Sequence, residues 1–582
     1  MANGTPWHRR PTFLGLIKLL GFRGVMRKEN LHDAQPRLAD DPPPPPEGSG
    51  GTNVRTASGA YNDLNIPAMG SAGTRFGRNV PLEHGHRDDA TILDPNPREV
   101  SRRLMTRQQF QPATILNLLA AAWIQFQVHD WFSHGTNDPN DPFDIPLEPD
   151  DPWPQEHRPM LVRRTRADTT RTPEEAHLPP TFTNSETHWW DGSQIYGSSV
   201  ALQKELRSGQ DGKLEIEDDG FLPLDDSGVD KTGVNGNWWI GLTLFHTLFT
   251  KEHNAICDRL RDENPSWTDE ELFDRARLIN AALMAKIHTV EWTPAILPHP
   301  TATAGVKGNW YGLFGEGKPR KFPGLFPLND TFTGIPGSPT DHHAAPYSLT
   351  EEFVAVYRMH PLIPDQIEFR ALTGGATQTL SIEEVAGAEA RNVFASVSVA
   401  DAFYSFGISH PGAVTLHNYP SFLQQNERTD GRVIDLAAID ILRDRERGVP
   451  RYNAFRELMH MDRVETFGEL TPDPVWAAEI EQVYGGDIDK VDVMVGMFAE
   501  KPPEGFGFSE TAFRIFLLMA SRRLKSDRFY TIDYRPEIYT QTGIDWVENN
   551  GLASVLMRHF PDVGPALDGV GNPFAPWKQT GQ

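Results

Sequence analysis

Apolar residues that recur every three to four positions over long stretches constrain the fold of this chain most. This spacing places them on one face of an α-helix, whereas runs that alternate as in a half-buried strand are few. Capping-box patterns begin two of the stretches, at Ser266 and Ser348. The stretches cover residues 113–131, 242–263, 268–293, 349–360 and 509–523. The pattern therefore predicts a mainly α protein, a large single-domain helical bundle with long loops.

The composition excludes some partners. A net charge of −24 argues against a nucleic-acid backbone as partner, because that binding depends on Lys and Arg. Cys257 is the only cysteine, so no disulfide can form within the chain, and an intracellular location is expected. No apolar run approaches the roughly 20 residues of a membrane span. We therefore expect a protein that is soluble or associated only peripherally with a membrane.

The chain divides by composition into three parts. Residues 1–39 form a basic amphipathic segment, 40–60 a Pro- and Gly-rich linker, and 61–582 the folded domain. The first 28 residues contain six basic residues and no acidic one. Three interpretations stay open for them: a helix on a membrane surface, an organelle transit peptide, and a helix docked on the body of the protein.

Gln125 and His129 stand four positions apart in an apolar helical stretch (AAAWIQFQVHDWF), so they share one helix face. A histidine with an amide one turn away is typical of a general base with a polar helper. A histidine satisfied within the core is the alternative, and it is the commoner case for this spacing.

Tyr357 and His360 (VYRMHPLIPD) stand three apart, and the spacing again places them on one helical face. Pro361 disfavours α conformation at His360, and a neutral histidine that ends a helix can reach an axial position on haem iron. A tyrosine one turn earlier would then lie near the porphyrin edge. The alternative is an aromatic pair in the core.

Asp130 comes directly after His129 on the predicted helix, and further oxygen-bearing side chains alternate in a later loop (THWWDGS). Two carboxylates, two hydroxyls and a backbone carbonyl are hard ligands that suit Ca²⁺, and a plain turn is the alternative. Zinc-protease, dinucleotide and P-loop patterns are absent from the sequence. The candidate calcium ligands are Asp130, Thr187, Trp189 through its carbonyl, Asp191 and Ser193.

Together these segments resemble the peroxidase–cyclooxygenase superfamily, and most closely the α-dioxygenases of fatty acids. The resemblance runs from about residue 61 to the C-terminus. Its most specific stretches are YNDLNIPAMG, AAWIQFQVHDW, WWDGSQIYGS, FTKEHNAICD, KIHTVEWT, NWYGLFG, YSLTEEFVAVYRMHPLIPD, RDRERGVPRYN and ASRRLKSDRFYT. So many matches in the same order make chance an unsatisfactory explanation.

The resemblance implies a role for each motif. His129 takes the place of the distal histidine and Gln125 that of its helper. Tyr357 takes the place of the radical residue and His360 that of the proximal haem ligand. The loop with Asp191 and the carboxylate of Asp130 correspond to the calcium site of the superfamily.

Further residues are implied by position. Asp440 stands where peroxidases place an Asn beside the proximal imidazole, and would accept a hydrogen bond from that ring. Arg443 matches a residue that pairs with a haem propionate. The carboxylate anchors of α-dioxygenases fall on His288, Thr293 and Arg523.

The departures from the pattern of animal peroxidases are informative. The segment GVNGNWWIGLTLFHT has neither the Arg nor the acidic residue found there, and Gln127 stands two positions before His129. The resemblance therefore implies haem b held without a covalent bond, and oxygenase rather than peroxidase activity.

The expected activity is oxygenation of fatty acids at C2, in which peroxide-oxidised haem raises a tyrosyl radical at Tyr357. Fatty acid, O₂ and peroxide are the expected small-molecule partners. The alternatives are a dioxygenase that attacks mid-chain, a haem peroxidase of small phenols or halides, and a calcium-stabilised helical binding protein without haem.

Overall fold

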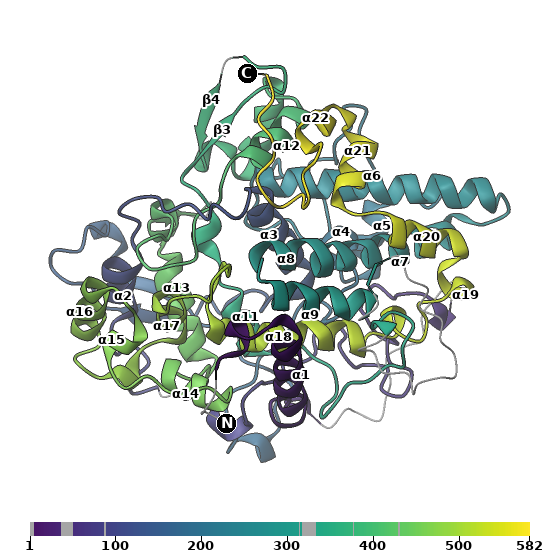
Figure 1. Ribbon diagram of the computed structural model, residues 1–582. Coiled ribbons are helices and arrows are strands. Elements are labelled where there is room, and N and C mark those ends of the chain that lie inside the picture. The colour runs from purple at the N-terminus through teal and green to yellow at the C-terminus, as the bar shows by residue number, and fades with distance from the viewer. Residues whose placement is uncertain are drawn as a thin grey trace.

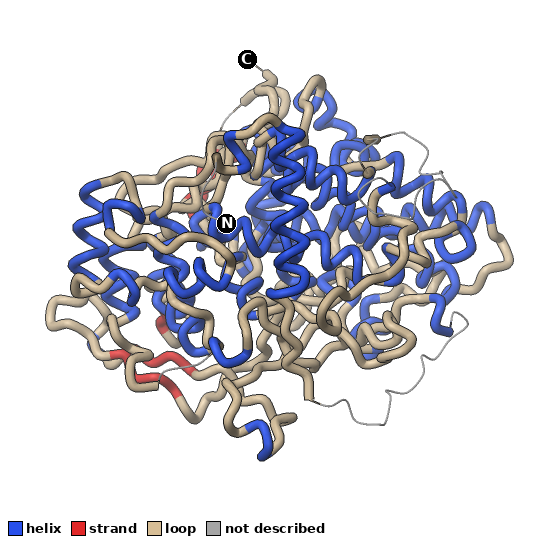
Figure 2. The backbone as a smooth tube through the Cα atoms, turned by 60° about the horizontal axis from the view of Figure 1, so that its bottom comes forward, coloured by secondary structure: helices blue, strands red, loops and turns tan. Residues whose placement is uncertain are grey.

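The computed structural model describes residues 5–36, 51–85, 89–312, 315–316, 333–375, 377–428 and 431–581. Helices and long loops make up most of this chain, and the strands are short (Figures 1 and 2). Residues 40–50 of the predicted linker lie outside the described residues. The predicted mainly α architecture is confirmed.

The longer helices are α1 (Thr12–Glu29), α3 (Leu119–Trp131), α6 (Ile240–Glu263), α7 (Asp269–Ile287), α9 (Pro300–Tyr311), α12 (Val399–Ile408), α13 (Leu436–Glu446), α16 (Pro474–Val483), α18 (Glu510–Ser526), α20 (Gln541–Asn549) and α21 (Leu552–His559). The shorter ones are α2 (Pro97–Val100), α4 (Ser193–Tyr196), α5 (Val200–Leu206), α8 (Thr293–Ile296), α11 (Glu351–Val356), α14 (Tyr452–Leu458), α15 (Phe467–Leu470), α17 (Val493–Ala499), α19 (Pro536–Tyr539) and α22 (Gly564–Leu567).

Three antiparallel strand pairs lie among the helices of the described chain. They are β1 (Pro142–Ile145) with β2 (Met160–Arg163), β3 (Gln366–Phe369) with β4 (Gln378–Ser381), and β5 (Asn426–Glu427) with β6 (Val433–Ile434). In the first pair, Phe143 and Ile145 turn into a small apolar cluster with Leu442 of α13. Each sheet of the described chain therefore has only two strands, and the first pair packs against α13.

Helix starts are the point on which the sequence prediction was partly wrong. The capping box of α7 is made by Thr268 with Glu271, and the N-cap of α11 is Thr350, whose side chain accepts from the backbone N–H of Phe353. The predicted positions, Ser266 and Ser348, lie two residues earlier. A hydroxyl caps only the helix whose free N–H groups it can reach, and both threonines are closer to the first turn.

The stretch at 349–360 is also not one helix. α11 ends at Val356, and His360 begins a separate 3₁₀ turn with Pro361. Tyr357 itself is the C-terminal cap, with φ −90° and ψ 11°. Proline disfavours helical backbone in the residue before it, so the chain turns between the two residues that the spacing had placed on one helical face.

α6 packs against both α3 and α7. Nearly every apolar residue of α3 is buried, because α6 covers one of its sides and α4 and α12 contact the others. α7 continues into a π-helical turn, η7 (His288–Trp292), before α8 begins. A π turn rotates the side chains that follow relative to a regular helix, and such turns are frequent at functional sites.

The N-terminal helix α1 is docked on α9 and α18 (Figure 1). A Cβ at Gly15 would lie 2.8 Å from Cγ2 of Thr301, so only glycine permits this approach of α1 to α9. Arg23 donates to Oδ1 of Asn309 at 2.8 Å. Docking is one of the three interpretations that the sequence left open. The opposite face of α1 points away from the protein.

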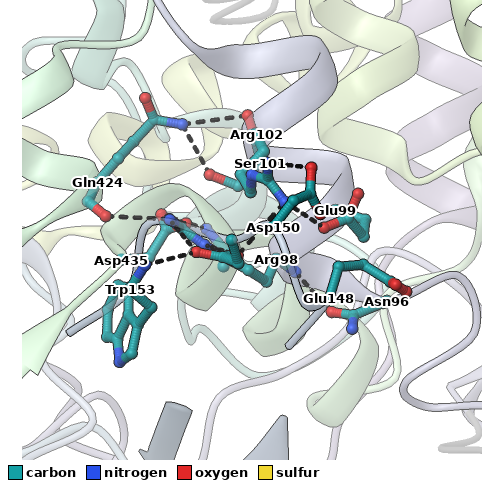
Figure 3. A network of polar contacts seen from close by, with 12 residues as sticks. Asn96, Arg98, Glu99, Ser101, Arg102, Glu148, Asp150, Trp153, Gln424 and Asp435 are labelled. Carbon is teal, nitrogen blue, oxygen red and sulfur yellow. Dashed lines mark hydrogen bonds and ion pairs between the residues drawn. The ribbon is translucent and has the colours of Figure 1, made fainter. Parts of the chain in front are cut away.

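A buried polar network fixes the start of α13 (Figure 3). Arg98 of α2 lies 3.0 Å from the carboxylate of Asp151 and 2.7 Å from that of Asp435. Asp435 is also the N-cap of α13, accepting from the backbone N–H of Ala438. Removal of one member of such a network would leave a buried charge without its partner, at a cost of about 3–5 kcal/mol. The network therefore anchors the helix that carries Asp440.

Within the described residues, every helix falls short of the length and apolar character needed to cross a bilayer.

Candidate active site

The predicted distal pair lies on α3, as its spacing indicated. Oε1 of Gln125 accepts a hydrogen bond of 2.8 Å from the indole of Trp239, and its amide nitrogen donates to the carbonyl of Asn237. Burial lowers the pKa of His129 to about 4, against a smaller opposing effect of the Val234 carbonyl. The imidazole is therefore neutral at pH 7 and able to accept a proton.

His360 is joined to α13 through Asp440. Nδ1 of His360 lies 2.8 Å from Oδ2 of this aspartate, which also accepts a hydrogen bond of 2.9 Å from the hydroxyl of Tyr419. The other carboxylate oxygen is paired with Arg358. Burial alone would raise the pKa of Asp440, but the charges of His360 and Arg358 hold it at about 2. This carboxylate is therefore ionised, and it orients the imidazole.

Tyr357 is surrounded by aromatic rings. Its ring centroid lies 5.1 Å from that of Trp131, 4.6 Å from that of Phe353 and 4.7 Å from that of Phe516, which stacks on it. Burial raises the pKa of the phenol above its ordinary value. The hydroxyl therefore stays protonated, and the ring is held from several sides.

Arg523 of α18 is a buried cation between two indoles. Its guanidinium carbon lies 4.1 Å from the ring centre of Trp131 and 4.4 Å from that of Trp190. The side chain is 2% exposed, and Nε and Nη2 have no hydrogen-bond partner. Within the described residues no carboxylate forms an ion pair with it. Burial of a charge in this way is costly unless an anion compensates it.

His288 and Thr293 lie at the two ends of the η7 turn. The ring of His288 lies 5.1 Å from both Trp131 and Trp190, the same indoles that flank Arg523. Burial lowers its pKa well below the usual value, and Trp123 donates to its Nδ1 at 3.2 Å. The hydroxyl of Thr293 donates to the carbonyl of His288. His288 and Arg523, two of the three predicted carboxylate anchors, thus contact the same pair of indoles, and Thr293 is bonded to the backbone of His288.

The five predicted calcium ligands form one buried group. None of them is more than 1% exposed. Three side-chain oxygens have no hydrogen-bond partner, namely Oδ2 of Asp130, Oγ1 of Thr187 and Oδ2 of Asp191. Nη2 of Arg277 lies 3.2 Å from the last of these. Ser193 donates to Oδ1 of Asp130 through both its backbone N–H and its hydroxyl.

Two buried carboxylates repel each other within this group. Burial and repulsion from Asp191 raise the pKa of Asp130 to about 8, and burial also raises the pKa of Asp191. Within the described residues, no three His, Cys, Asp or Glu side chains gather around one point. A site here would consequently need hydroxyl and carbonyl oxygens besides its two carboxylates.

Arg443 lies on α13 but is already engaged. It pairs with Glu446 and donates to the carbonyl of Arg163. Arg447, which sequence reasoning missed, is equally buried but has an Nε without a partner, and burial lowers its pKa to about 10. The family position had singled out Arg443, but which of the two arginines is already engaged depends on what packs against each.

Four other residues of the site were also missed. Arg358 could have been suspected from its place between Tyr357 and His360, but nothing marks Tyr419, which is far away in the sequence. Trp131 stands in the α3 motif near His129, and Trp190 in the predicted calcium-binding loop, yet their contact with Arg523 joins three separate segments.

A surface cavity of about 1110 Å³ opens on the outer side of η7, lined by Val290, Glu291 and Lys307 among others. None of the predicted site residues lines it. The cluster around Trp131 is therefore distinct from this cavity.

Comparison with known proteins gives the family. The family description "animal haem peroxidase" matches residues 54–567. An alpha-dioxygenase of Pisum sativum is 36% identical over 98% of this chain and 89% of its own length, and alpha-dioxygenase 2 of Arabidopsis thaliana is 37% identical over 98% and 91%.

Solved structures agree. The fatty acid alpha-dioxygenase of Oryza sativa, in a variant with palmitic acid, superposes with a TM-score of 0.89 at 36% identity, covering 98% of this chain and 94% of that one. Peroxidase A of Dictyostelium discoideum, at 20% identity and a TM-score of 0.69, shares the fold. The chain belongs to the animal haem peroxidase family and, within it, to the alpha-dioxygenases.

Proposed function

We propose that this protein is a haem-dependent fatty-acid α-dioxygenase that inserts O₂ at C2 and forms 2-hydroperoxy fatty acids. The observation that carries the proposal is the position of Arg523. It is a buried cation without an acidic partner among the described residues, and it shares Trp131 with Tyr357. A carboxylate bound to this guanidinium would hold the adjacent carbon, C2, on the side of the tyrosine.

The anion is expected to be a fatty acid. The Oryza sativa relative is described with palmitic acid, and the surroundings of Tyr357 are aromatic and apolar. Arg523 would supply a charge-assisted contact, which is stronger than a neutral hydrogen bond. His288 and Thr293 would complete the head-group site, the threonine by turning its hydroxyl from the carbonyl of His288 to the carboxylate.

The residues on either side of the site fit the haem that the family implies. Asp440 engages Nδ1 of His360, which leaves Nε2 for the iron, and this arrangement of a ligating histidine with a carboxylate is the usual one. Bound haem would supply the oxidising power from peroxide that removes a hydrogen atom from Tyr357. His129, neutral at pH 7, would move the peroxide proton from one oxygen to the other, with Gln125 as its polar neighbour.

Two further residues bear on how haem is held. Arg443 was expected at a propionate, but its guanidinium is engaged by Glu446. Arg447 has a buried nitrogen without a partner, so we assign the larger share of that role to Arg447.

The chemistry at Tyr357 is a hydrogen-atom cycle. The tyrosyl radical takes one hydrogen from C2, so that the C–H bond breaks and the phenolic O–H bond forms. O₂ adds to the carbon radical. The resulting peroxyl group takes the phenolic hydrogen back, which yields the hydroperoxide and restores the radical. The aromatic packing holds the ring in place through the cycle.

Calcium is part of the proposal. The three buried oxygens of Asp130, Thr187 and Asp191 that have no hydrogen-bond partner, with the carbonyl of Trp189 and the hydroxyl of Ser193, form a set of hard ligands. Two carboxylates match the charge of one Ca²⁺. Because Asp130 follows His129 on α3, the ion would also fix the end of the distal helix.

The outward face of α1 supports a further part of the proposal, namely peripheral contact with a membrane. Phe13, Leu14 and Ile17 are 72%, 48% and 52% exposed, and the segment around them is basic within an acidic chain. Such a face favours an anionic lipid surface. Replacing these three residues with Ser should reduce binding to vesicles that contain phosphatidylserine, while activity on dissolved fatty acid stays. Unchanged vesicle binding would refute this role.

The principal test is the product of the haem-loaded enzyme from palmitate and O₂, identified by mass spectrometry. We expect a 2-hydroperoxy acid from this saturated substrate, because C2 is activated by the carboxyl group. Tyr357→Phe should keep fold and haem but lower oxygenation by orders of magnitude. Reaction only with polyunsaturated acids, and oxygen found mid-chain, would favour a cyclooxygenase-like reaction. Rapid turnover of guaiacol or bromide would favour a peroxidase.

A further inference from the structure

The radical residue lies in contact with an oxidisable side chain. Trp131 is 5.1 Å from Tyr357 between ring centroids, and Trp190 is 5.5 Å beyond it. Indoles are oxidised at potentials close to those of phenols, so a radical formed on Tyr357 could transfer to Trp131 and from there to Trp190. The proposed reaction requires that the radical stay on the tyrosine until substrate arrives.

Arg523 contacts both tryptophans of this transfer path. Its guanidinium carbon is 4.1 Å from the ring centre of Trp131 and 4.4 Å from that of Trp190. A cation over a neutral indole is attracted to the ring face, whereas the same cation repels an indole that has lost an electron. Both effects act in the same direction, and both make the two tryptophans harder to oxidise.

The proton of Trp131 is blocked as well. For the radical to move from Tyr357 to Trp131, the indole must give up one electron, and the phenoxyl oxygen must gain that electron and a proton. If Trp131 is to end as a neutral radical, it must also release its Nε1 proton. Nε1 is buried and has no hydrogen-bond partner among the described residues, so no base is in place to receive that proton.

Trp190 is similarly restricted. Its Nε1 donates at 2.7 Å to Oε1 of Gln127, and a neutral amide is too weak a base to take the proton. Only an indole cation radical remains accessible at either position, and that is the species that Arg523 opposes.

We infer that Arg523 confines the tyrosyl radical to Tyr357 by electrostatic protection of Trp131 and Trp190, in addition to its part in substrate binding. This inference rests on the proposed tyrosyl-radical function. The protection acts while no carboxylate neutralises the guanidinium, which is the interval in which an idle radical would otherwise damage the protein.

The size of the effect follows from the distances. Two unit charges about 4 Å apart interact by about 4 kcal/mol at the effective dielectric of a protein, which corresponds to about a thousandfold in the equilibrium between the two radical positions. Removal of the charge should therefore change the observed radical, and not only its lifetime.

The test uses haem-loaded enzyme without fatty acid, treated with peroxide and frozen for electron paramagnetic resonance. Peptide mass spectrometry then measures oxidation of the two tryptophans. Wild type should give a tyrosyl signal and intact tryptophans. Arg523→Gln should give a tryptophan signal and oxidised indole, and Arg523→Lys, which keeps the charge, should restore the tyrosyl signal. Arg259→Gln, at an exposed helical position, is the control for loss of one positive charge.

A second measurement needs no substitution. A 2,2-difluoro fatty acid has a carboxylate but no hydrogen at C2, so it should neutralise Arg523 in wild-type enzyme without reacting. Its binding, checked by a haem spectral titration, should increase tryptophan oxidation.

The outcomes separate the two claims. A tyrosyl signal and intact tryptophans in Arg523→Gln, or no increase in tryptophan oxidation with the bound difluoro acid, would overturn the inference while the proposed function stands. Absence of any tyrosyl radical in wild type would overturn the proposed radical mechanism, and the inference with it.

Discussion

Arg523→Ala should separate substrate binding from folding. The wild-type guanidinium is 2% exposed and has two nitrogens without partners. Because no carboxylate of the described chain forms an ion pair with it, its removal breaks no salt bridge among the described residues. The substrate carboxylate, in contrast, would lose its principal contact.

The magnitude follows from that burial. Breaking a buried charge pair costs about 3–5 kcal/mol, so the apparent KM for palmitate should rise by between about a hundredfold and a few thousandfold. Thr293→Val removes only a neutral hydrogen bond, which is worth about 0.5–1.5 kcal/mol, and should raise KM about two- to tenfold. Haem content should stay near that of wild type in both variants.

The assay is O₂ uptake against palmitate concentration, with palmitamide as a neutral analogue of the same length. Wild type should prefer the acid strongly, and Arg523→Ala should lose most of that preference while its KM for the amide changes little. A KM for palmitate within threefold of wild type, or an equal loss for acid and amide, would refute the head-group assignment.

Three further predictions concern haem, metal and pH. His360→Ala should lose most bound haem, whereas His129→Ala should keep the Soret band and lose activity; full haem content in the former would contradict the ligand assignment. Asp191→Asn and treatment with a chelator should each lower calcium content and Tm. Elemental analysis that finds no calcium in native protein would show that the loop is a plain turn and not a metal site. Burial lowers the pKa of His253 to about 4 from the ordinary 6.5, so the unfolded chain binds the extra proton first as pH falls. Stability should therefore be lost between pH 6.5 and 4, by up to about 3 kcal/mol for this group. His253→Gln should remove that part of the loss in denaturant unfolding, and an unchanged pH dependence would contradict it.

The fold class was predictable because it depends on local spacing. Apolar residues at helical period determine which stretches can bury one face, and this identified the helices that became α3, α6, α7 and α18. That Gln125 and His129 lie on one helix was predictable for the same reason, since both lie within two turns of α3. Motif order was informative as well, because the resemblance to α-dioxygenases depended on short stretches and not on their positions in space.

Local spacing failed where competing hydrogen bonds or packing decided. Thr268 and not Ser266 caps α7, because the choice depends on which hydroxyl reaches the free N–H groups of the first turn. The helix predicted through His360 ends at Val356, because Pro361 disfavours helical backbone in the residue before it.

The electrostatics of the site could come only from the tertiary structure. Arg523 lies between an indole of α3 and an indole of the predicted calcium-binding loop, hundreds of positions away in the sequence. Its lack of an acidic partner is a property of everything that packs around it. Likewise, Arg443 and Arg447 look equivalent in the sequence, yet only the first is satisfied by Glu446 and a backbone carbonyl. Sequence determined which residues share a helix face, because that is a short-range property of the backbone. Burial and the pairing of charges depend on contacts between distant segments, so only the folded structure decided them.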